Sequence, residues 1–467
     1  MGYIDDLLDI NKCGKDIKEQ HDFTVTELNK RKLQINHDKS ARMHIQRRRS
    51  NCSVDRCEDL KVDKWSVEKK KENDHISLKD KYEGKVSLKS VEQYLYLGNI
   101  ISFDGSNSHT IKERVSKGKG AVREILHILE GVFLGDNYIE AFKLLRNSKL
   151  ISILTYNTEV IHGLSQKDIE SLDNVDMFLA RKALRLSSKS TRCLILLELQ
   201  MVSVEFVIKS KRINFLHNLL SSDSSSLAKN VFLQQIKDPI EGDFAKLVKK
   251  DLRDCQIDLS FEEILKYSKA NFKQLVKKAC ENACFSKLKE QKNKLSKGKE
   301  IKYQQFQRQS YLIPGSNISS DDMCNILKCR IRDLDLKGNF PNAYEDKKCP
   351  FTRCNSPESQ FHFAYCEFYS DNSIIPRGIE YADLFESDVQ KQFQIMKVLT
   401  KRMEERNKKF GTSLHTREGL EDPRMKERRV RKGVTRNTTR QPLSLVIRGR
   451  KNIKSLRIKK NNTKQDK

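Results

Sequence analysis

The chain has 467 residues, enough for two or three domains, and a formal net charge of +27. So large a basic excess favours a polyanionic partner such as RNA or DNA. No apolar run of about 18 residues occurs, so we expect no membrane span. The N-terminus has no apolar signal region, and the 12 cysteines are therefore expected as reduced thiols or metal ligands in a protein of the nucleus or cytoplasm, not as disulfides of a secreted protein. The oligomeric state is left open.

The first residues contain two adjacent carboxylates. Asp5 and Asp6 lie between apolar residues, with Tyr3 two positions before the first. Adjacent like charges repel, so such a pair usually has a divalent cation beside it. The apolar residues on both sides predict the tip of a β-hairpin. The alternative is an exposed Asp-Asp pair at a frayed end.

Weakly patterned segments follow. Residues 15–32 predict a helix, and Leu33 and Ile35 alternate as in a strand before Lys39. Residues 47–90 are polar and charged, which predicts a variable loop or a weak hairpin.

Residues 91–102 predict a strand pair, because apolar residues alternate along them. Gly98 suits a bend that a nucleic-acid backbone could approach closely, or the turn of an ordinary hairpin. The turn at Asp104-Gly105 then leads into helices.

From Thr110 to about Leu220 the apolar spacing is helical. Three stripes are expected to face the core: Val115, Val122, Ile125 and Leu129; Ile139, Phe142 and Leu145; Leu172, Val175, Phe178 and Leu179. Ser165 and Asp168 are suited to the start of the third helix.

Residues 230–312 are mostly helical in pattern and rich in lysine. Cys280 and Cys284 lie four apart on one helix face, where core thiols are expected. Ser319 begins another helix that is expected to run to about Leu336, and residues 379–408 form an amphipathic helical segment.

The most specific motif lies between these last helices. Cys349, Cys354, His362 and Cys366 are spaced Cys-x4-Cys-x7-His-x3-Cys. Three thiolates and an imidazole suit a tetrahedral structural zinc ion, and a module this short needs the metal to fold. The alternative is scattered reduced thiols beside an ordinary histidine.

The motifs together resemble the C-terminal part of reverse transcriptases of non-LTR (LINE-like) retroelements. The resemblance rests on Tyr3-x-Asp5-Asp6, on Tyr-Leu-Gly-x-Ile-Ile at residues 96–101, on thumb-like segments at 154–184 and 197–216, and on the zinc knuckle. The chain departs from the family in three places: the first knuckle spacing is x4 where x2 is common, Ile161 stands where many relatives have Trp, and Gln200 where Gly is usual.

The resemblance implies an RNA-directed DNA polymerase. Asp5 and Asp6 would then hold Mg²⁺ together with an Asp from an earlier strand, which has no counterpart here. We therefore expect the chain as written not to polymerise DNA. Lys39 would lie near the phosphates of the incoming nucleotide, or is a lysine of a surface turn.

In a thumb, basic residues along helices contact phosphates. The candidates, any of which could instead belong to a solvated helix face, are Lys112, Arg114, Lys117, Lys119, Arg181 and Lys182. Tyr3 and Gly98 are further candidates for nucleic-acid contacts.

The expected fold is mainly α with a small α+β N-terminal remnant. Its domains are a polymerase palm remnant (1–46), a variable charged loop (47–90), a primer-grip hairpin and helical thumb (91–220), a helical connection (227–345), a zinc knuckle (346–370), C-terminal helices (371–409) and a basic, disordered tail (410–467). The expected function is a nucleic-acid-binding fragment of a transposable-element polymerase. The alternative is a non-enzymatic zinc- and RNA- or DNA-binding protein derived from such an element.

Overall fold

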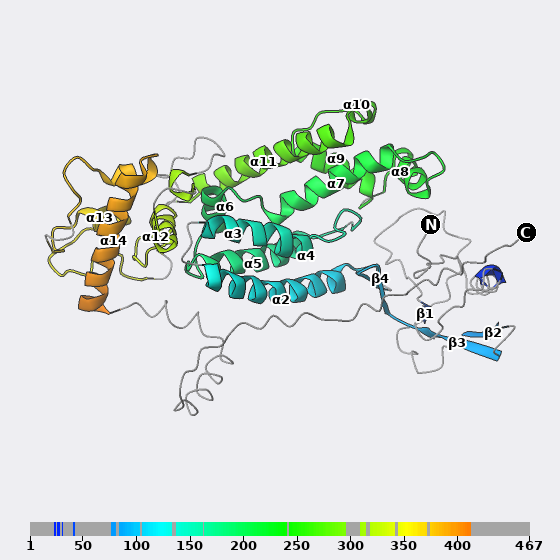
Figure 1. The fold of residues 1–467 in the computed structure, drawn as a ribbon, viewed down its shortest axis with the longest axis horizontal. Helices are drawn as coiled ribbons and strands as arrows, with labels where there is room; N and C mark the ends of the chain where they lie inside the picture. Colours follow the sequence, from blue (N-terminus) through cyan, green and yellow to red (C-terminus); the bar gives the residue numbers. More distant parts are fainter. Residues whose placement is uncertain are drawn as a thin grey trace, which may run out of the picture. The chain divides into compact units, whose positions relative to one another are not determined.

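The computed structural model (Figure 1) describes residues 23–24, 26–28, 30, 41–42, 76–80, 84–102, 105–132, 137–161, 163–240, 242–295, 309–313, 318–340, 344–370 and 374–411. Over these residues the protein is mainly α-helical, as the sequence predicts, and its strands are short.

Two strands of the first sheet lie in the segment for which a loop or weak hairpin is expected. β2 (Ile76–Asp80) and β3 (Gly84–Ser90) form an antiparallel hairpin. β1 (Ala41–Arg42) pairs parallel with β3, so the strand order is β1-β3-β2.

A second hairpin follows directly. β4 (Gln93–Tyr96) pairs antiparallel with β5 (Asn99–Ser102), so the predicted strand pair is confirmed. Leu97 and Gly98, between the strands, have φ angles of 45° and 76°. Two successive positive φ angles match the twist of a two-residue hairpin, and glycine adopts such an angle at no steric cost.

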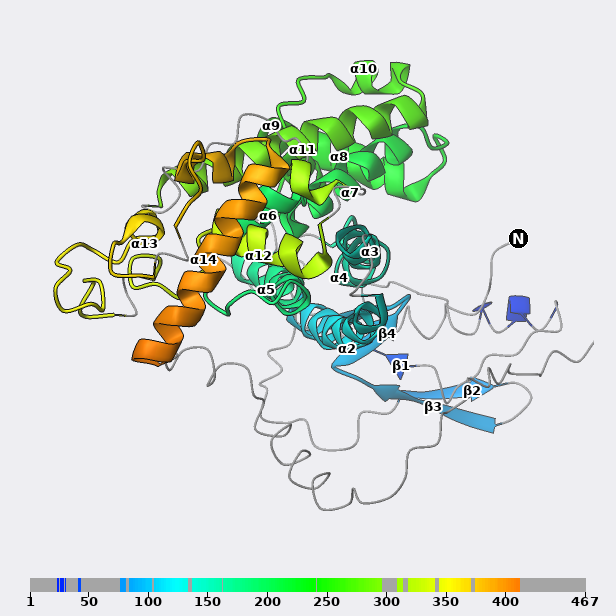
Figure 2. The same cartoon turned by 60° about the vertical axis from the view of Figure 1, so that its left-hand side comes forward.

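The helical body begins with two helices that pack side by side, α2 (Ser108–Val132) and α5 (Gln166–Ala183) (Figure 2). Gly118 lies where α2 meets its neighbours. A Cβ atom there would be 2.7 Å from Leu154 Cδ2 and 3.2 Å from Val175 Cγ1. The close approach of α2 therefore depends on the missing side chain.

Short helical segments connect these two helices: α3 (Tyr138–Leu145), the π-helix η3 (Arg146–Ile151) and α4 (Ser152–Leu154). α5 begins where the sequence predicts. Ser165 Oγ accepts a hydrogen bond from the Asp168 N–H at 3.2 Å, and Asp168 Oδ2 accepts one from the Ser165 N–H at 2.9 Å. This reciprocal pair satisfies two N–H groups of the first turn.

The predicted apolar stripes are mostly buried. The fully buried members are Val122, Ile125, Leu129, Ile139, Phe142, Leu172, Val175 and Leu179. The prediction that Phe178 faces the core is wrong, because this residue is 47% exposed. On α5 the inward positions are partly polar: Asp173 pairs with Arg192 and Asp176 with Arg146, each at 2.6 Å. The two buried carboxylates, rather than Phe178, complete the inner face of the helix.

A further group of helices packs around α7 and α11. The group comprises α6 (Arg192–Leu199), α7 (Val204–Leu220), α8 (Leu227–Lys237), α9 (Phe244–Asp254), α10 (Phe261–Lys266) and α11 (Lys269–Asn293). Cys280 and Cys284 on α11 are 2% and 0% exposed, so the expected core thiols are confirmed.

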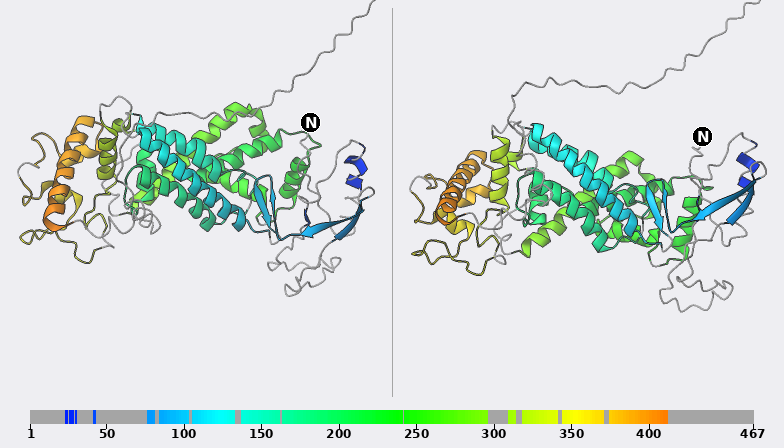
Figure 3. Two further views of the ribbon diagram at one scale, coloured as in Figure 1. Left: turned by 60° about the horizontal axis from the view of Figure 1, so that its bottom comes forward. Right: turned by 90° about the horizontal axis from the view of Figure 1, so that it is seen from below.

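The last elements are the 3-10 segment η5 (Ser310–Leu312), α12 (Ser320–Arg330), α13 (Gln360–Tyr365), the 3-10 segment η7 (Tyr381–Phe385) and α14 (Val389–Phe410). α12 and α14 pack together (Figure 3).

Two expected boundaries in this region are wrong. α12 ends at Arg330 rather than near Leu336, and Arg332 takes a positive φ of 55°, which breaks the helix. The helical segment expected over 379–408 is divided into η7 and α14. Asp388 starts α14 by accepting hydrogen bonds from the N–H groups of Gln390 and Lys391 at 2.9 and 3.1 Å.

Gln200 ends α6 in a backbone conformation that favours glycine. Its φ and ψ are 53° and 47°, and its N–H bonds the carbonyls of Leu196 and Leu197. Replacing Gln200 with glycine is expected to raise the free energy of unfolding by about 0.5–1 kcal/mol, because the left-handed strain exceeds the added entropy of the unfolded chain. Chemical denaturation measures the change.

The matched control is Gln200→Ala, which removes the same side-chain atoms but keeps a Cβ atom at positive φ. It should give no gain. Equal stability of the glycine and alanine variants would show that the positive φ at this position carries no strain.

Candidate metal centre

A tight turn positions the first two cysteines of the knuckle. Lys348 and Pro357 form an isolated antiparallel bridge. Within it, the Cys349 N–H donates to the Ser356 carbonyl at 2.9 Å. The Cys354 N–H donates to the Phe351 carbonyl at 2.8 Å, which curls the four-residue insert so that both thiols face the same side.

One helical turn positions the other two ligands. Ser359 begins α13, and its Oγ accepts a hydrogen bond from the His362 N–H at 3.1 Å. His362 lies on the first turn, and Cys366 lies directly after the helix. A spacing of four residues brings both side chains to one face of the helix.

The four donor atoms converge. Cys349 Sγ lies 3.9 Å from Cys366 Sγ, Cys354 Sγ lies 3.3 Å from His362 Nε2, and all four donors lie within 4.8 Å of one another. A tetrahedral zinc ion with Zn–S bonds of about 2.3 Å and a Zn–N bond of about 2.0 Å requires ligand–ligand distances of roughly 3.5–3.8 Å. The cluster can hold a metal ion, and its donor set is compatible with zinc.

Two buried arginines of α14 brace this module, and no local sequence pattern predicts them. Arg402 Nη1 donates to the carbonyls of Phe363 and Cys366 at 2.8 and 3.1 Å. Arg406 Nε donates to the Glu358 carboxylate at 2.7 Å, and Glu358 directly precedes Ser359, the residue that caps α13. Long-range contacts from another helix therefore fix the ligand-bearing turn, much as outer-shell groups orient metal ligands.

Aromatic side chains close the module on one side. The Phe351 ring packs edge-to-face on Tyr369 and on Phe410, with centroids 4.9 and 5.0 Å apart, and Tyr369 packs on Phe363 at 5.1 Å. Phe410 is the last residue of α14, so this cluster also fastens the knuckle to that helix.

Burial changes the proton affinities of the ligands. It raises the pKa of the Cys349 thiol to about 12 and also raises the pKa of Cys366. It lowers the pKa of His362, which keeps the imidazole neutral, as a metal ligand must be. In the metal-free protein these two thiols are thus protonated at neutral pH, and a cation must displace their protons in order to bind.

Metal affinity is therefore expected to fall as the pH falls. Protons compete for the thiolates of Cys349 and Cys366, so the logarithm of the affinity should rise by about 2 per pH unit on the acid side of their pKa values. At Cys354, burial is outweighed by hydrogen bonds, which lower the pKa, so this thiol raises the slope to about 3 only below that lowered pKa. His362 adds to the competition only below its lowered pKa. Zinc competition with a chromogenic chelator, repeated over a pH series, measures the slope, and an affinity independent of pH would exclude thiolate ligation.

Two residues predicted to contact nucleic acid, Arg114 and Gly98, contact each other. Arg114 is 4% exposed, and its Nη2 donates to the Gly98 carbonyl at 2.8 Å and to Asn99 Oδ1 at 2.7 Å. The Tyr156 ring would lie 3.1 Å from a Cβ added at Gly98, and Arg114 lies over the same ring, 4.7 Å from its centroid. The prediction that Arg114 contacts phosphate is corrected: it fastens the β4–β5 hairpin to α2.

The other basic candidates differ in exposure. Lys112, Lys117 and Lys119 are exposed on α2, and Lys117 pairs with Glu113 at 2.7 Å. Arg181 is half-buried and donates to the Ser190 carbonyl at 2.8 Å, which holds its guanidinium against the body of the protein.

Lys182, also half-buried, lies over the Phe178 ring at 5.8 Å from the centroid. Tyr3, Asp5, Asp6 and Lys39, as well as the basic tail, lie outside the described residues. The magnesium prediction, which rests on Asp5 and Asp6, stays a prediction.

In the part of the chain that the structure describes, no helix combines the length and the apolar character needed to cross a membrane. No protein-family model, curated protein or solved structure matches the chain. The functional inference therefore depends on the chain's own residues.

Proposed function

We propose that the chain is a nucleic-acid-binding part of a non-LTR retroelement reverse transcriptase, with a structural zinc ion holding residues 346–370. One observation carries the proposal: the donor atoms of Cys349, Cys354, His362 and Cys366 converge in a small module that follows a long helical body. That order agrees with what the sequence resemblance implies.

The net charge of the chain and the exposed lysines of α2 support a nucleic-acid partner. The chain has a net charge of +27, and α2 exposes Lys112, Lys117 and Lys119 within about two turns. Cations on a rigid helix contact phosphates without reading the base sequence. The proposed function of this surface is to hold a nucleic-acid backbone.

The second candidate is a non-enzymatic zinc- and RNA- or DNA-binding protein derived from such an element. The metal cluster supports this candidate as well as it supports the first, because a structural zinc site does not by itself perform chemistry. Primer extension tests for polymerase activity: the full chain is incubated with primer, template, nucleotides and Mg²⁺. Extension would assign a polymerase activity to this chain and exclude the second candidate, whereas both candidates predict binding without extension.

Fluorescence anisotropy with labelled RNA and DNA tests the binding itself. We expect the logarithm of the binding constant to fall linearly with the logarithm of salt concentration. Replacing Lys112, Lys117 and Lys119 with Gln should reduce the slope by about 1 for each phosphate that the variant no longer binds, whereas Lys→Arg replacements should preserve it. Failure of the wild-type chain to bind either nucleic acid would overturn the proposal.

A further inference from the structure

One face of α9 carries a row of positive charges. Lys246, Lys249, Lys250 and Arg253 are all exposed. These four residues are spaced i, i+3, i+4 and i+7, so they form one stripe along the helix. We call these four residues the α9 stripe.

The two carboxylates near the end of the same helix pair with α7. Asp251 is 2% exposed and accepts a hydrogen bond from Arg212 Nε of α7 at 2.7 Å. Asp254, beside the stripe, pairs with Lys209 Nζ of α7, also at 2.7 Å. Both acids are thus matched by cations of α7, on the side where α9 packs against the body of the protein.

The apolar residues of α9 hold the stripe in a fixed orientation. Ala245, Val248 and Leu252 are 2%, 0% and 6% exposed, and they lie on the packed side of the helix. At the end of the helix, Cys255 Sγ lies 3.5 Å from Cys280 Sγ of α11. The stripe is therefore presented on a packed, rigid element rather than on a loop.

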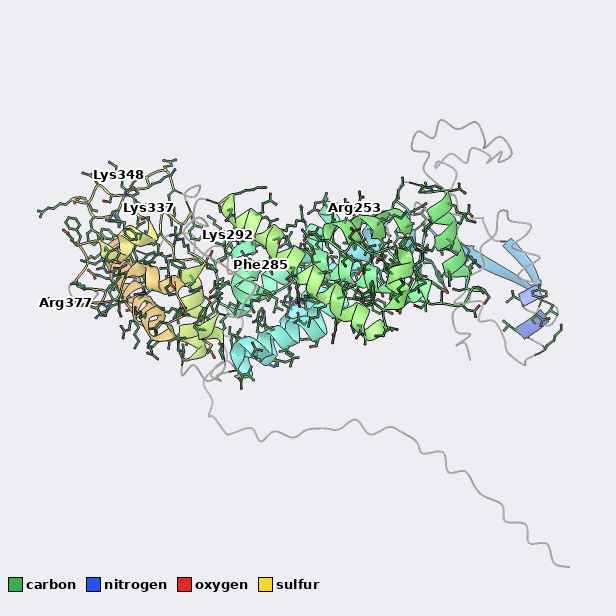
Figure 4. The ribbon with its side chains drawn as sticks, turned by 90° about the horizontal axis from the view of Figure 1, so that it is seen from above. Arg253, Phe285, Lys292, Lys337, Lys348 and Arg377 are labelled. Atoms are coloured by element: carbon green, nitrogen blue, oxygen red, sulfur yellow. The ribbon has the colours of Figure 1, made fainter. Side chains whose placement is uncertain are left out.

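The adjoining part of α11 is also basic. Within about two turns before Cys280, α11 exposes Lys273, Lys277 and Lys278. Because Cys280 contacts Cys255, these lysines belong to the part of α11 that adjoins the end of α9. Arg253, at that end of the stripe, is labelled in Figure 4.

We propose that the α9 stripe is a docking surface for the phosphate backbone of double-stranded nucleic acid. This inference rests on the proposed function, and it adds a second contact surface to the one on α2. The stripe spans about 10 Å of helix, comparable with three steps between successive phosphates of one duplex strand, each with an axial rise of about 3.4 Å.

The surroundings of the stripe favour a duplex over a single strand. Binding of single strands depends on aromatic side chains that stack with unpaired bases. Phe244 of α9 is 9% exposed and faces the core. Phe261, the first residue of α10, packs on Phe232 with centroids 5.7 Å apart, and Lys249 covers its ring at 5.9 Å. Neither ring is therefore available to stack with unpaired bases. The straight row of cations instead matches the regular backbone of a duplex.

The experiment compares two triple variants of the full chain. In one, Lys246, Lys249 and Lys250 are replaced with Gln; in the matched control, Lys397, Lys401 and Lys408 of α14, also exposed, are replaced with Gln. Each variant has three fewer positive charges than the wild type. Anisotropy titrations use a short labelled DNA duplex and its single strand over a range of salt concentrations, and circular dichroism checks that each variant is folded.

We expect the stripe variant to bind the duplex at least about tenfold more weakly than the control and to reduce the salt slope by about 3. A variant with Lys→Arg at the same three positions should bind like the wild type. Equal slopes for stripe and control variants, with the wild type binding well, would overturn the inference and leave the proposed function standing. If the stripe variant bound only the single strand more weakly, the duplex would be rejected as the ligand of the stripe. If the wild type bound neither nucleic acid, both this inference and the proposed function would be rejected.

Discussion

Replacing Cys366 with Ser is expected to remove the metal from the protein and to unfold residues 346–370. The wild-type chain should contain about one zinc ion after dialysis and the variant close to none, because a structural site needs all four ligands. Metal analysis gives the stoichiometry, and hydrogen exchange gives the extent of unfolding.

The expected effect is large because the module has few apolar side chains of its own, although Arg402 and Arg406 of α14 brace it from outside. Its apolar side chains are a small group around Phe363 and Tyr369, and the bound metal supplies folding free energy on the order of 10 kcal/mol in modules of this size. The Cys349 and Cys354 N–H groups, which are hydrogen-bonded inside the turn, should exchange faster in the variant, and the amides of α2 and α5 should stay protected.

Cys329→Ser is the matched control. Cys329 is 1% exposed on α12 but is not among the converging donors. This variant should keep its zinc. The assignment of the site would be wrong if the Cys366→Ser variant retained one zinc ion. It would also be wrong if the wild type held no zinc and Cys349 and Cys366, whose sulfur atoms lie 3.9 Å apart, were found joined in a disulfide.

The second large effect is expected from Arg330, the largest fully buried side chain among the described residues. Replacing Arg330 with Met should lower the free energy of unfolding by about 3–5 kcal/mol, because it leaves the Glu198 carboxylate buried without its counter-charge. Chemical denaturation monitored by circular dichroism measures the change.

The partners of Arg330 explain why the effect is large. Its guanidinium donates to the Glu198 carboxylate of α6, to the Leu384 carbonyl of η7 and, at 2.7 Å, to Gln309 Oε1. Glu198 is 0% exposed and also accepts a hydrogen bond from the Tyr311 hydroxyl at 2.8 Å. One side chain thus joins α12 to three other parts of the chain.

Arg185→Met provides a control, because Arg185 also pairs with an acid across the fold. Its partner is Asp321 of α12 at 2.6 Å, but both side chains are more than half exposed. Removing this pair should cost less than about 1 kcal/mol. Adding Glu198→Gln to Arg330→Met should recover part of the stability, since no charge then stays buried. Equal costs for the Arg330 and Arg185 variants would contradict the assigned role of the buried network.

The sequence alone determined the features that depend on near neighbours. The spacing of Cys349, Cys354, His362 and Cys366 predicted a metal cluster because ligands within one turn and one helix need little else to meet. The start of α5 at Ser165 was predicted for the same reason, since a capping pair spans three residues. Helical periodicity also identified most of the buried stripe positions.

The tertiary structure decided which charged side chains are surface groups and which are part of the core. Arg114 was expected on a nucleic-acid-binding face and instead fastens a hairpin; Arg330 and Arg402 stand in no recognisable sequence pattern and are buried. Arg330 meets a partner 132 residues away. A residue's own neighbours in sequence carry no information about such a partner, because the pairing exists only once α6, α12 and η7 have packed together. The local pattern therefore predicts elements and short-range ligands, whereas the packing of the helices sets the long-range polar contacts that hold them.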